Sequence, residues 1–332
     1  MELIIKPTEA CNFHCTFCSS TDIATDKSAT LPVDKIAAFL DRFPETNTII
    51  VNGGDPLMMS PEYYYDILGE VEKRRMSTVL SLTTNLWAFY RAPEKWTPLF
   101  RHPLVDVATS FNYGTTRRIT KDKVFTEEVF WDVSNLFLER VGYRPDFISV
   151  ITDENLATAL ANVLLAKKMD VECKLNYAYA SGAQAKSLLK GKIYRVYLDI
   201  IDQGLAPWEY NAKQLLKMRE RTPTTCPLRR DCDETIRCLQ PEGDYYSCGA
   251  FGDDRLYPIS FQEEVLERGE KQTPLAGRSE LHFLKEECLS CPLFAICNGC
   301  KKTITDLKRN DVVEAHCAEM KANLPRLLEY VG

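Results

Sequence analysis

Residues Leu3-Ile4-Ile5-Lys6 form a short β-rich run, and the loop Cys11-Asn12-Phe13-His14-Cys15-Thr16-Phe17-Cys18 follows it closely. Three thiolates in so short a loop can hold three irons of a cubane cluster and leave the fourth iron without a local protein ligand. An open coordination position is typical of catalytic metal sites, whereas structural sites are closed. The spacing alone leaves one alternative open, a zinc site completed by His14 or by a distant cysteine.

Up to about residue 180, β-rich runs alternate with amphipathic helical patterns. The predicted strands are Leu3–Lys6, Thr48–Asn52, Thr78–Thr83, Val105–Phe111, Phe147–Thr152 and Val171–Tyr177. The predicted helices are Val33–Phe43, Pro61–Met76, 93–101, Thr126–Val141 and Glu154–Met169. This alternation predicts an α/β fold with right-handed βαβ units and a parallel sheet. About six such units favour a partial (β/α)6 TIM-like barrel, in which reactive groups belong in the loops at the carboxyl ends of the strands.

Composition excludes several classes of protein. The 332 residues include 47 Asp and Glu against 41 Lys and Arg, and a net charge of −6 argues against a general nucleic-acid or anionic-membrane binder. No stretch approaches the roughly 20 apolar residues that cross a bilayer, and the first residues lack the features of a signal peptide. We therefore expect a cytoplasmic protein, where disulfides are rare, so the 13 cysteines need another explanation.

The cysteine loop resembles the CX3CX2C signature of radical S-adenosylmethionine (radical SAM) enzymes, including the aromatic Phe17 just before the third cysteine. The resemblance implies that Cys11, Cys15 and Cys18 bind a [4Fe–4S] cluster whose free iron chelates S-adenosylmethionine (SAM). It also implies that the cluster donates an electron to the sulfonium, which releases methionine and a 5′-deoxyadenosyl radical. Phe17 would lie near the adenine. The partial barrel of this family agrees with the fold expected from the strand and helix pattern.

Three strand ends carry motifs similar to those of the same family. Asn52-Gly53-Gly54-Asp55-Pro56 looks like its GGE-P motif, which binds the amino group of SAM, although Asp55 stands where glutamate is usual. Thr83-Thr84-Asn85 is similar to the polar ending near the methionyl or ribose end of SAM. Ser110 occupies a position where the family often has a serine near the cofactor. The basic residues Arg117, Arg118, Lys121 and Lys123 follow it, and they are expected on a solvated surface loop, with a role facing an acidic or peptide carboxylate substrate as the alternative.

Nine of the remaining ten cysteines lie between Cys226 and Cys317, with the spacing Cys288-X2-Cys291-X5-Cys297-X2-Cys300 at the centre. This array resembles the SPASM domain, an extension that carries auxiliary clusters. The resemblance implies a first auxiliary [4Fe–4S] cluster and a second one. Its ligand sets are Cys226, Cys232, Cys248 and Cys300 for the first, and Cys288, Cys291, Cys297 and Cys317 for the second. The CX2C spacing before Cys300 is one residue shorter than usual. A zinc-ribbon-like site at Cys288, Cys291, Cys297 and Cys300 and a single cluster are the alternatives.

Two cysteines remain outside these sets. Cys173 lies in a predicted strand and is most simply a core residue. Cys238 lies in a predicted hairpin strand, where it is either a packed side chain or a hydrogen-atom donor of the kind that some epimerases of the family use. Asp253 and Asp254 are the nearest carboxylates that could serve as a general base, and we take Asp254 as the candidate.

The predicted organisation is a barrel core at 1–182, a helical bridge at 183–221 with helices Gln184–Leu205 and Asn211–Arg221, and a SPASM domain at 222–332 that ends in a helix near Asp311–Tyr330. We expect a radical SAM oxidoreductase that modifies a ribosomal peptide or protein, with an electron donor such as flavodoxin or ferredoxin and a peptide-presenting partner protein. A small-molecule epimerase or dehydrogenase, for example one acting on an aminosugar, is the alternative enzyme. A zinc-binding interaction module is the alternative from another class.

Overall fold

The computed structural model describes residues 1–219, 232–261, 284–297 and 300–331. Six parallel strands form a curved sheet in chain order, and all six lie within two residues of the predicted runs. They are β1 (Glu2–Ile5), β2 (Thr48–Val51), β3 (Val79–Thr83), β4 (Val105–Ser110), β5 (Phe147–Ile151) and β6 (Cys173–Tyr177). The expected partial barrel is therefore confirmed.

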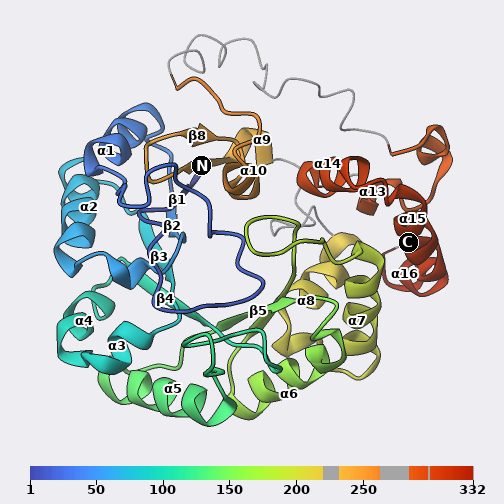
Figure 1. Ribbon diagram of the computed structural model, residues 1–332, viewed down its shortest axis with the longest axis horizontal. Helices are drawn as coiled ribbons and strands as arrows, with labels where there is room; N and C mark the ends of the chain where they lie inside the picture. Colours follow the sequence, from blue (N-terminus) through green and yellow to red (C-terminus); the bar gives the residue numbers. More distant parts are fainter. Residues whose placement is uncertain (220–231, 262–283, 298–299, 332) are drawn as a thin grey trace.

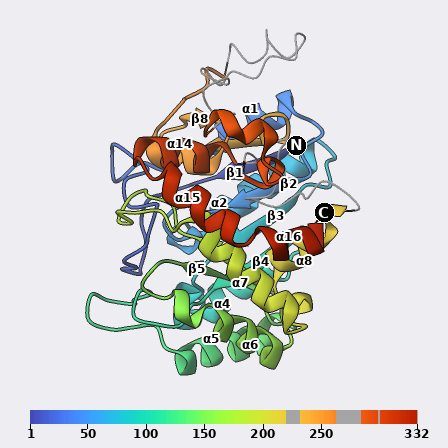
Figure 2. The ribbon, with the colours of Figure 1, turned by 90° about the vertical axis from the view of Figure 1, so that its right-hand side faces the viewer.

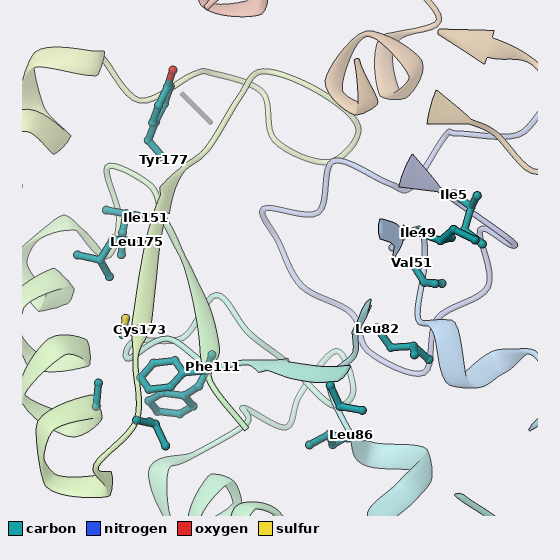
Figure 3. Close-up of a cluster of buried hydrophobic side chains, with 14 of the residues drawn as sticks. Ile5, Ile49, Val51, Leu82, Leu86, Phe111, Ile151, Cys173, Leu175 and Tyr177 are labelled. Atoms are coloured by element: carbon teal, nitrogen blue, oxygen red, sulfur yellow. The ribbon is translucent and has the colours of Figure 1, made fainter. Parts of the chain in front are cut away.

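Helices surround the strands on the outside of the curved sheet (Figure 1). They are α1 (Val33–Arg42), α2 (Pro61–Lys73), α3 (Trp87–Arg91), α4 (Pro93–Phe100), α5 (Glu127–Val141) and α6 (Ala159–Met169). Short 3-10 helices lie at Pro56–Met58, Leu156–Thr158, Ala206–Trp208, Lys217–Arg219 and Glu286–Ser290. Alternate strand residues such as Ile5, Ile49 and Leu175 are fully buried in the apolar core (Figure 3). Their neighbours along each strand point to the opposite face, toward the barrel interior.

The sheet continues beyond β1 with chain from the cysteine-rich region. Strand β7 (Ile236–Leu239) pairs with β1 in parallel, and β8 (Tyr245–Tyr246) pairs with β7 as an antiparallel hairpin. The predicted hairpin strand around Cys238 is thus present, but it also extends the barrel sheet. The short helices α9 (Cys232–Thr235) and α10 (Gly249–Asp254) flank this hairpin. Loops of the cysteine-rich region are therefore brought to the same end of the sheet as the loop that follows β1.

The remaining helices are α7 (Lys190–Asp202), α8 (Tyr210–Leu216), α13 (Phe294–Cys297), α14 (Lys301–Arg309), α15 (Val313–Ala322) and α16 (Leu324–Val331). Both views show α15 and α16 beside α7 and α8 (Figures 1 and 2). The close approach of α15 to α7 depends on Gly191, because a Cβ there would lie 2.6 Å from backbone and side-chain atoms of Glu319.

Several predicted helices differ from the structure. Within Glu154–Met169 the α-helix starts at Ala159, after a 3-10 turn, and within Asn211–Arg221 it ends at Leu216, while residues 220 and 221 lie outside the described residues. Helix α7 starts at Lys190 rather than Gln184, because Ser187 Oγ accepts a hydrogen bond from Ala180 N and donates one to Asp306, which holds this segment as a loop. The predicted terminal helix is two helices that meet at Asn323, whose side-chain amide bonds Gly191 O at 2.8 Å. No helix of the described residues is long and apolar enough to span a membrane.

Candidate active site

The cysteine loop lies at the carboxyl end of β1, where a parallel α/β fold places its reactive groups. Two backbone hydrogen bonds join it to the loop that follows β4: His14 N donates to Arg118 O at 2.8 Å, and Thr16 N donates to Thr116 O at 3.0 Å. Within the loop, Phe13 N donates to Cys11 Sγ at 3.4 Å. These hydrogen bonds fix the backbone of the segment that carries the three thiols.

Gly53 and Gly54 allow the chain before the cysteine loop to lie directly on the end of β2. Gly54 N donates to Thr8 O at 2.9 Å, and Asp55 N donates to Ala10 O at 2.8 Å. A Cβ on Gly54 would lie 2.1 Å from Ala10 O, and Gly53 has a φ of +113°, which favours glycine. The close approach that these glycines permit here is that of backbone to backbone, and it positions the cysteine loop.

The Asp55 carboxylate is turned into the protein and is only 2% exposed. It accepts hydrogen bonds from Leu57 N at 2.9 Å, from Asn85 N at 2.8 Å, and from Thr84 Oγ1 at 3.0 Å. Burial raises the pKa of Asp55, and these hydrogen bonds oppose that shift. Asp55 thus clamps the end of β3 to the end of β2, and Pro56 continues from it into the first 3-10 helix. The sequence pattern predicts a contact with the SAM amino group, and the structure shows an internal role for Asp55.

Asn85 carries this clamp to the cysteine loop. Its side-chain amide donates to Asn12 Oδ1 at 2.7 Å and lies 4.0 Å from Cys11 Sγ. Asn85 Oδ1 accepts from Trp87 N, which fixes the orientation of the amide. The predicted residues Asp55, Thr84 and Asn85 are therefore one hydrogen-bonded unit against the first cysteine.

Arg117 is the buried cation of this site, although the sequence pattern places it on a solvated surface. Its side chain donates to Ser110 Oγ at 2.7 Å and to Asn112 Oδ1 at 3.2 Å. Its guanidinium lies 5.2 Å from the centre of the Phe17 ring, which is a cation–π distance. Burial raises the pKa of the Cys18 thiol, and the charge of Arg117 is among the influences that lower it. Ser110 and Phe17 are thus brought together by a residue that we did not expect there.

A cavity of about 290 Å³ opens beside the cysteine loop. Phe17, Cys18 and Ser19 line one side, and residues from the ends of β5 and β6 line the other, including Lys174 and Asn176. A second cavity of about 470 Å³ lies between the 185–192 segment and α14. Tyr177 and Tyr179 line both cavities. Figure 3 shows Tyr177 at the end of β6, where it belongs to the buried cluster.

The second set of C-terminal cysteines lies together. Cys288, Cys291, Cys297 and Cys317 line one small cavity, and the charges of the other three influence the pKa of Cys297, which burial raises to about 11. Four cysteines that line one cavity are a donor set of the kind that an iron–sulfur cluster takes.

The first set is described only in part. Burial raises the pKa of Cys248, and the largest charge effect on it comes from Cys300. Cys232 influences the pKa of Lys301, the residue next to Cys300. Cys226 lies outside the described residues. Cys300 therefore interacts with Cys248 despite its shortened spacing, and Cys232 interacts with the residue next to Cys300.

The catalytic candidates Cys238 and Asp254 have structural partners. Cys238 is fully buried in β7, and Gln240 Nε2 donates to its sulfur at 3.8 Å, which favours the core-packing alternative over hydrogen-atom donation. Cys173 is likewise fully buried. Asp254 Oδ2 lies 2.7 Å from Lys302 Nζ, so it serves as the counter-ion of a buried lysine.

Asp253 lies closer to the cysteine loop than the sequence pattern suggests. Its carboxylate pairs with the buried Lys6 and accepts a hydrogen bond from Ser19 Oγ at 3.1 Å, next to Cys18. Lys6 Nζ also donates to Gly249 O at 3.0 Å, beside Cys248. One ion pair therefore connects the loop after β1 with the loop that carries Cys248.

Residues 5–165 match the Radical SAM superfamily. This part of the chain is a radical SAM domain. Comparison with curated proteins finds no match. Among solved structures, the fold of the whole chain is similar to that of native anSMEcpe with bound AdoMet, with a TM-score of 0.73, 17% identity and 99% of each chain covered. SuiB of Streptococcus suis bound to S-adenosylmethionine has a TM-score of 0.60 and 17% identity over 90% of this chain and 72% of that chain.

In this radical SAM domain, the cysteine loop, the hydrogen bonds around Asp55 and the buried Arg117 meet at one end of the sheet. The sequence pattern assigned a cofactor role to these residues except Arg117, for which it left a solvated surface loop and a substrate carboxylate as alternatives. Its only signal was its place seven residues after Ser110, in a loop now seen to pair with the cysteine loop. The likeness of the two solved structures is one of fold, in which a C-terminal extension follows the barrel.

Proposed function

We propose that this protein is a radical SAM oxidoreductase that abstracts a hydrogen atom from a peptide or protein. The observation that carries the proposal is the triad Cys11, Cys15 and Cys18 at the carboxyl end of β1, with Cys18 lining a cavity that a buried cation adjoins. When bound, the [4Fe–4S] cluster and SAM supply reductive cleavage of the sulfonium and a 5′-deoxyadenosyl radical. The roles proposed below are those of the protein's own side chains.

Arg117 and Phe17 are suited to hold SAM by complementary chemistry. SAM carries one carboxylate, and Arg117 offers a buried guanidinium that Ser110 and Asn112 orient. Phe17 offers an apolar ring in the cavity for the adenine. Asn85 lies where its amide can hold Asn12 and the Cys11 side of the loop in place. Asp253, paired with Lys6, is the carboxylate nearest to Cys18 through Ser19 and is our candidate for a proton acceptor.

The second cavity supports the proposed substrate class. It is larger than the first and adjoins it at Tyr177 and Tyr179. Its lining carries cations and anions, among them Lys192 with Asp153, together with backbone of the 185–189 loop. Such a mixed polar lining suits the amides and varied side chains of a peptide. Two structures of similar fold are anSMEcpe with a Cp18Cys peptide and SuiB with the precursor peptide SuiA.

The C-terminal thiols are proposed to hold two auxiliary [4Fe–4S] clusters of a SPASM domain. The second set, which lines one cavity, fits a four-thiolate cluster. The first set is proposed to consist of Cys248 and Cys300, which interact, of Cys232, which interacts with the neighbour of Cys300, and of Cys226. These clusters would accept an electron after hydrogen abstraction.

Hydrogen transfer from a deuterated substrate tests the proposal. The reduced enzyme is supplied with SAM and with perdeuterated peptides encoded near its gene, and 5′-deoxyadenosine is analysed for deuterium. We expect a peptide to transfer deuterium, and transfer only from a small molecule would contradict the peptide substrate. Ala185→Trp fills the second cavity and should abolish this transfer while SAM cleavage without substrate continues. Ala157→Trp, at an exposed position that does not line the cavity, is the matched control.

A further inference from the structure

Four side chains form a continuous polar chain between the end of β6 and the start of α14. The hydroxyl of Tyr177 lies 2.5 Å from Thr303 Oγ1, and the hydroxyls of Tyr177 and Tyr179 are 3.3 Å apart. The Tyr179 hydroxyl also lies 3.6 Å from Cys300 Sγ, within hydrogen-bond distance of a sulfur atom. The chain therefore leads from the wall shared by the two cavities to a cysteine of the C-terminal array.

The last bond of this chain has only one possible direction once Cys300 is a metal-bound thiolate. A thiolate has no proton, so the Tyr179 hydroxyl must donate to the sulfur. The Tyr179 hydroxyl has one hydrogen, so its donation to the sulfur replaces its donation to the Tyr177 hydroxyl, and the bond between Tyr177 and Thr303 can run in either direction.

Lys302, whose ammonium lies near the Tyr179 ring, is paired with carboxylates. Lys302 Nζ lies 2.7 Å from Asp254 Oδ2 and forms a second ion pair with Asp306, and its side chain is 1% exposed. Its ammonium is 5.6 Å from the centre of the Tyr179 ring. Lys302 can therefore polarise the phenol through the ring while its ammonium pairs with two carboxylates.

The position of Cys300 in the fold favours a negative charge on its sulfur. Cys300 is the N-cap residue of α14, a helix of 9 residues, and the N-terminus of a helix stabilises a nearby anion. The interaction between Cys300 and Cys248 places the sulfur with the first auxiliary ligand set.

We propose that Tyr179 is a positioning residue for the first auxiliary cluster, and that its hydroxyl donates a hydrogen bond to the sulfur of Cys300. The proposal rests on the cluster assignment made under the proposed function. A hydrogen bond to a thiolate ligand stabilises the more negative, reduced form of a cluster, so it raises the reduction potential. Because Tyr177 and Tyr179 line both cavities, the same hydroxyls connect the contents of those cavities to the cluster.

The test uses a parent variant with Cys11→Ala, Cys15→Ala and Cys18→Ala, so that only auxiliary clusters contribute to the spectra. Reduction potentials are measured by EPR-monitored titration, and exchangeable protons near the reduced clusters are detected by ENDOR in H2O and D2O. We expect Tyr179→Phe to lower one of the potentials and to remove one exchangeable-proton coupling. Tyr177→Phe, the matched control one step further along the chain, should retain that coupling. Replacement of Tyr179 by 3-fluorotyrosine, a more acidic phenol, should raise the same potential.

Unchanged potentials and couplings in both Tyr179 variants would overturn the inference, and so would a parent variant that binds no iron. SAM cleavage by the unmodified protein is measured separately. Loss of that activity alone would contradict the proposed function and leave the Tyr179 assignment standing. Intact SAM cleavage with no Tyr179 effect would overturn the assignment alone.

Discussion

Replacement of Asp55 distinguishes an internal clamp from a ligand of SAM. Asp55→Ala removes the acceptor of two backbone N–H groups, Leu57 and Asn85, and of the Thr84 hydroxyl, all at a carboxylate that is 2% exposed. Each stranded buried donor costs about 1–3 kcal/mol. The burial of an ionised carboxylate, which raises its pKa, is relieved at the same time. We therefore expect a net loss of about 3 kcal/mol in the free energy of unfolding.

The assay is urea denaturation of the reduced apoprotein, which contains neither cluster nor SAM. Asp55→Asn keeps one oxygen but turns an NH2 group toward a donor, so we expect a loss of about 2 kcal/mol. Asp55→Glu restores the usual residue of the motif but must fit one more methylene into a packed site, at a cost of about 1–3 kcal/mol. If Asp55→Ala leaves the stability of the apoprotein within about 0.5 kcal/mol and only weakens SAM binding, the clamp is refuted.

Three further predictions concern the site and its scaffold. Arg117→Ala should weaken SAM binding to the reconstituted protein by about 10-fold to 100-fold, as measured by equilibrium dialysis, whereas Arg118→Ala, which removes an exposed side chain bonded to backbone, should not. Gly54→Ala should prevent iron binding at the N-terminal cysteine loop, because the new Cβ would clash with Ala10 O. In Gly69→Ala, the control in α2, the new Cβ meets no neighbouring atom, and the variant should be more stable by about 0.5–1 kcal/mol. Equal iron content in the two variants would contradict this prediction. Burial raises the pKa of Glu209 from 4.5 to about 7, so its contribution to stability is complete below about pH 4.5 and is lost as the pH rises through 7. The stability of the apoprotein relative to Glu209→Gln should therefore fall by about 3 kcal/mol over that range. A pH-independent difference between the two proteins would refute this prediction.

Several barrel strands could be predicted because they are short runs rich in β-branched residues. The pattern of Thr48–Val51 or Phe147–Ile151 is local, and it needs no knowledge of distant contacts. The pairing of β7 with β1 joins residues more than 230 positions apart, and no periodicity in either segment encodes it. The pairing that extends the sheet beyond β1 therefore could not be predicted from local sequence patterns.

The site residues divide in the same way. Cysteine spacing is a local signal and identified the loop after β1, whereas the burial of Arg117 depends on how the loop after β4 folds over Phe17. The inward turn of Asp55 also follows from tertiary contacts, since its partners lie on β3 and the next loop. The break near Asn323 is a mixed case, because Pro325 marks it locally but the contact with Gly191 O fixes it.

The central claim is that Cys11, Cys15 and Cys18 hold a cluster that cleaves SAM. It is tested most directly by 5′-deoxyadenosine formation in the anaerobically reconstituted, dithionite-reduced protein and in its Cys15→Ala variant. The account predicts 5′-deoxyadenosine from the unmodified protein and none from Cys15→Ala, while the variant keeps its auxiliary iron. Continued formation of 5′-deoxyadenosine by Cys15→Ala, or none from the unmodified protein with its full complement of iron and sulfide, would contradict it.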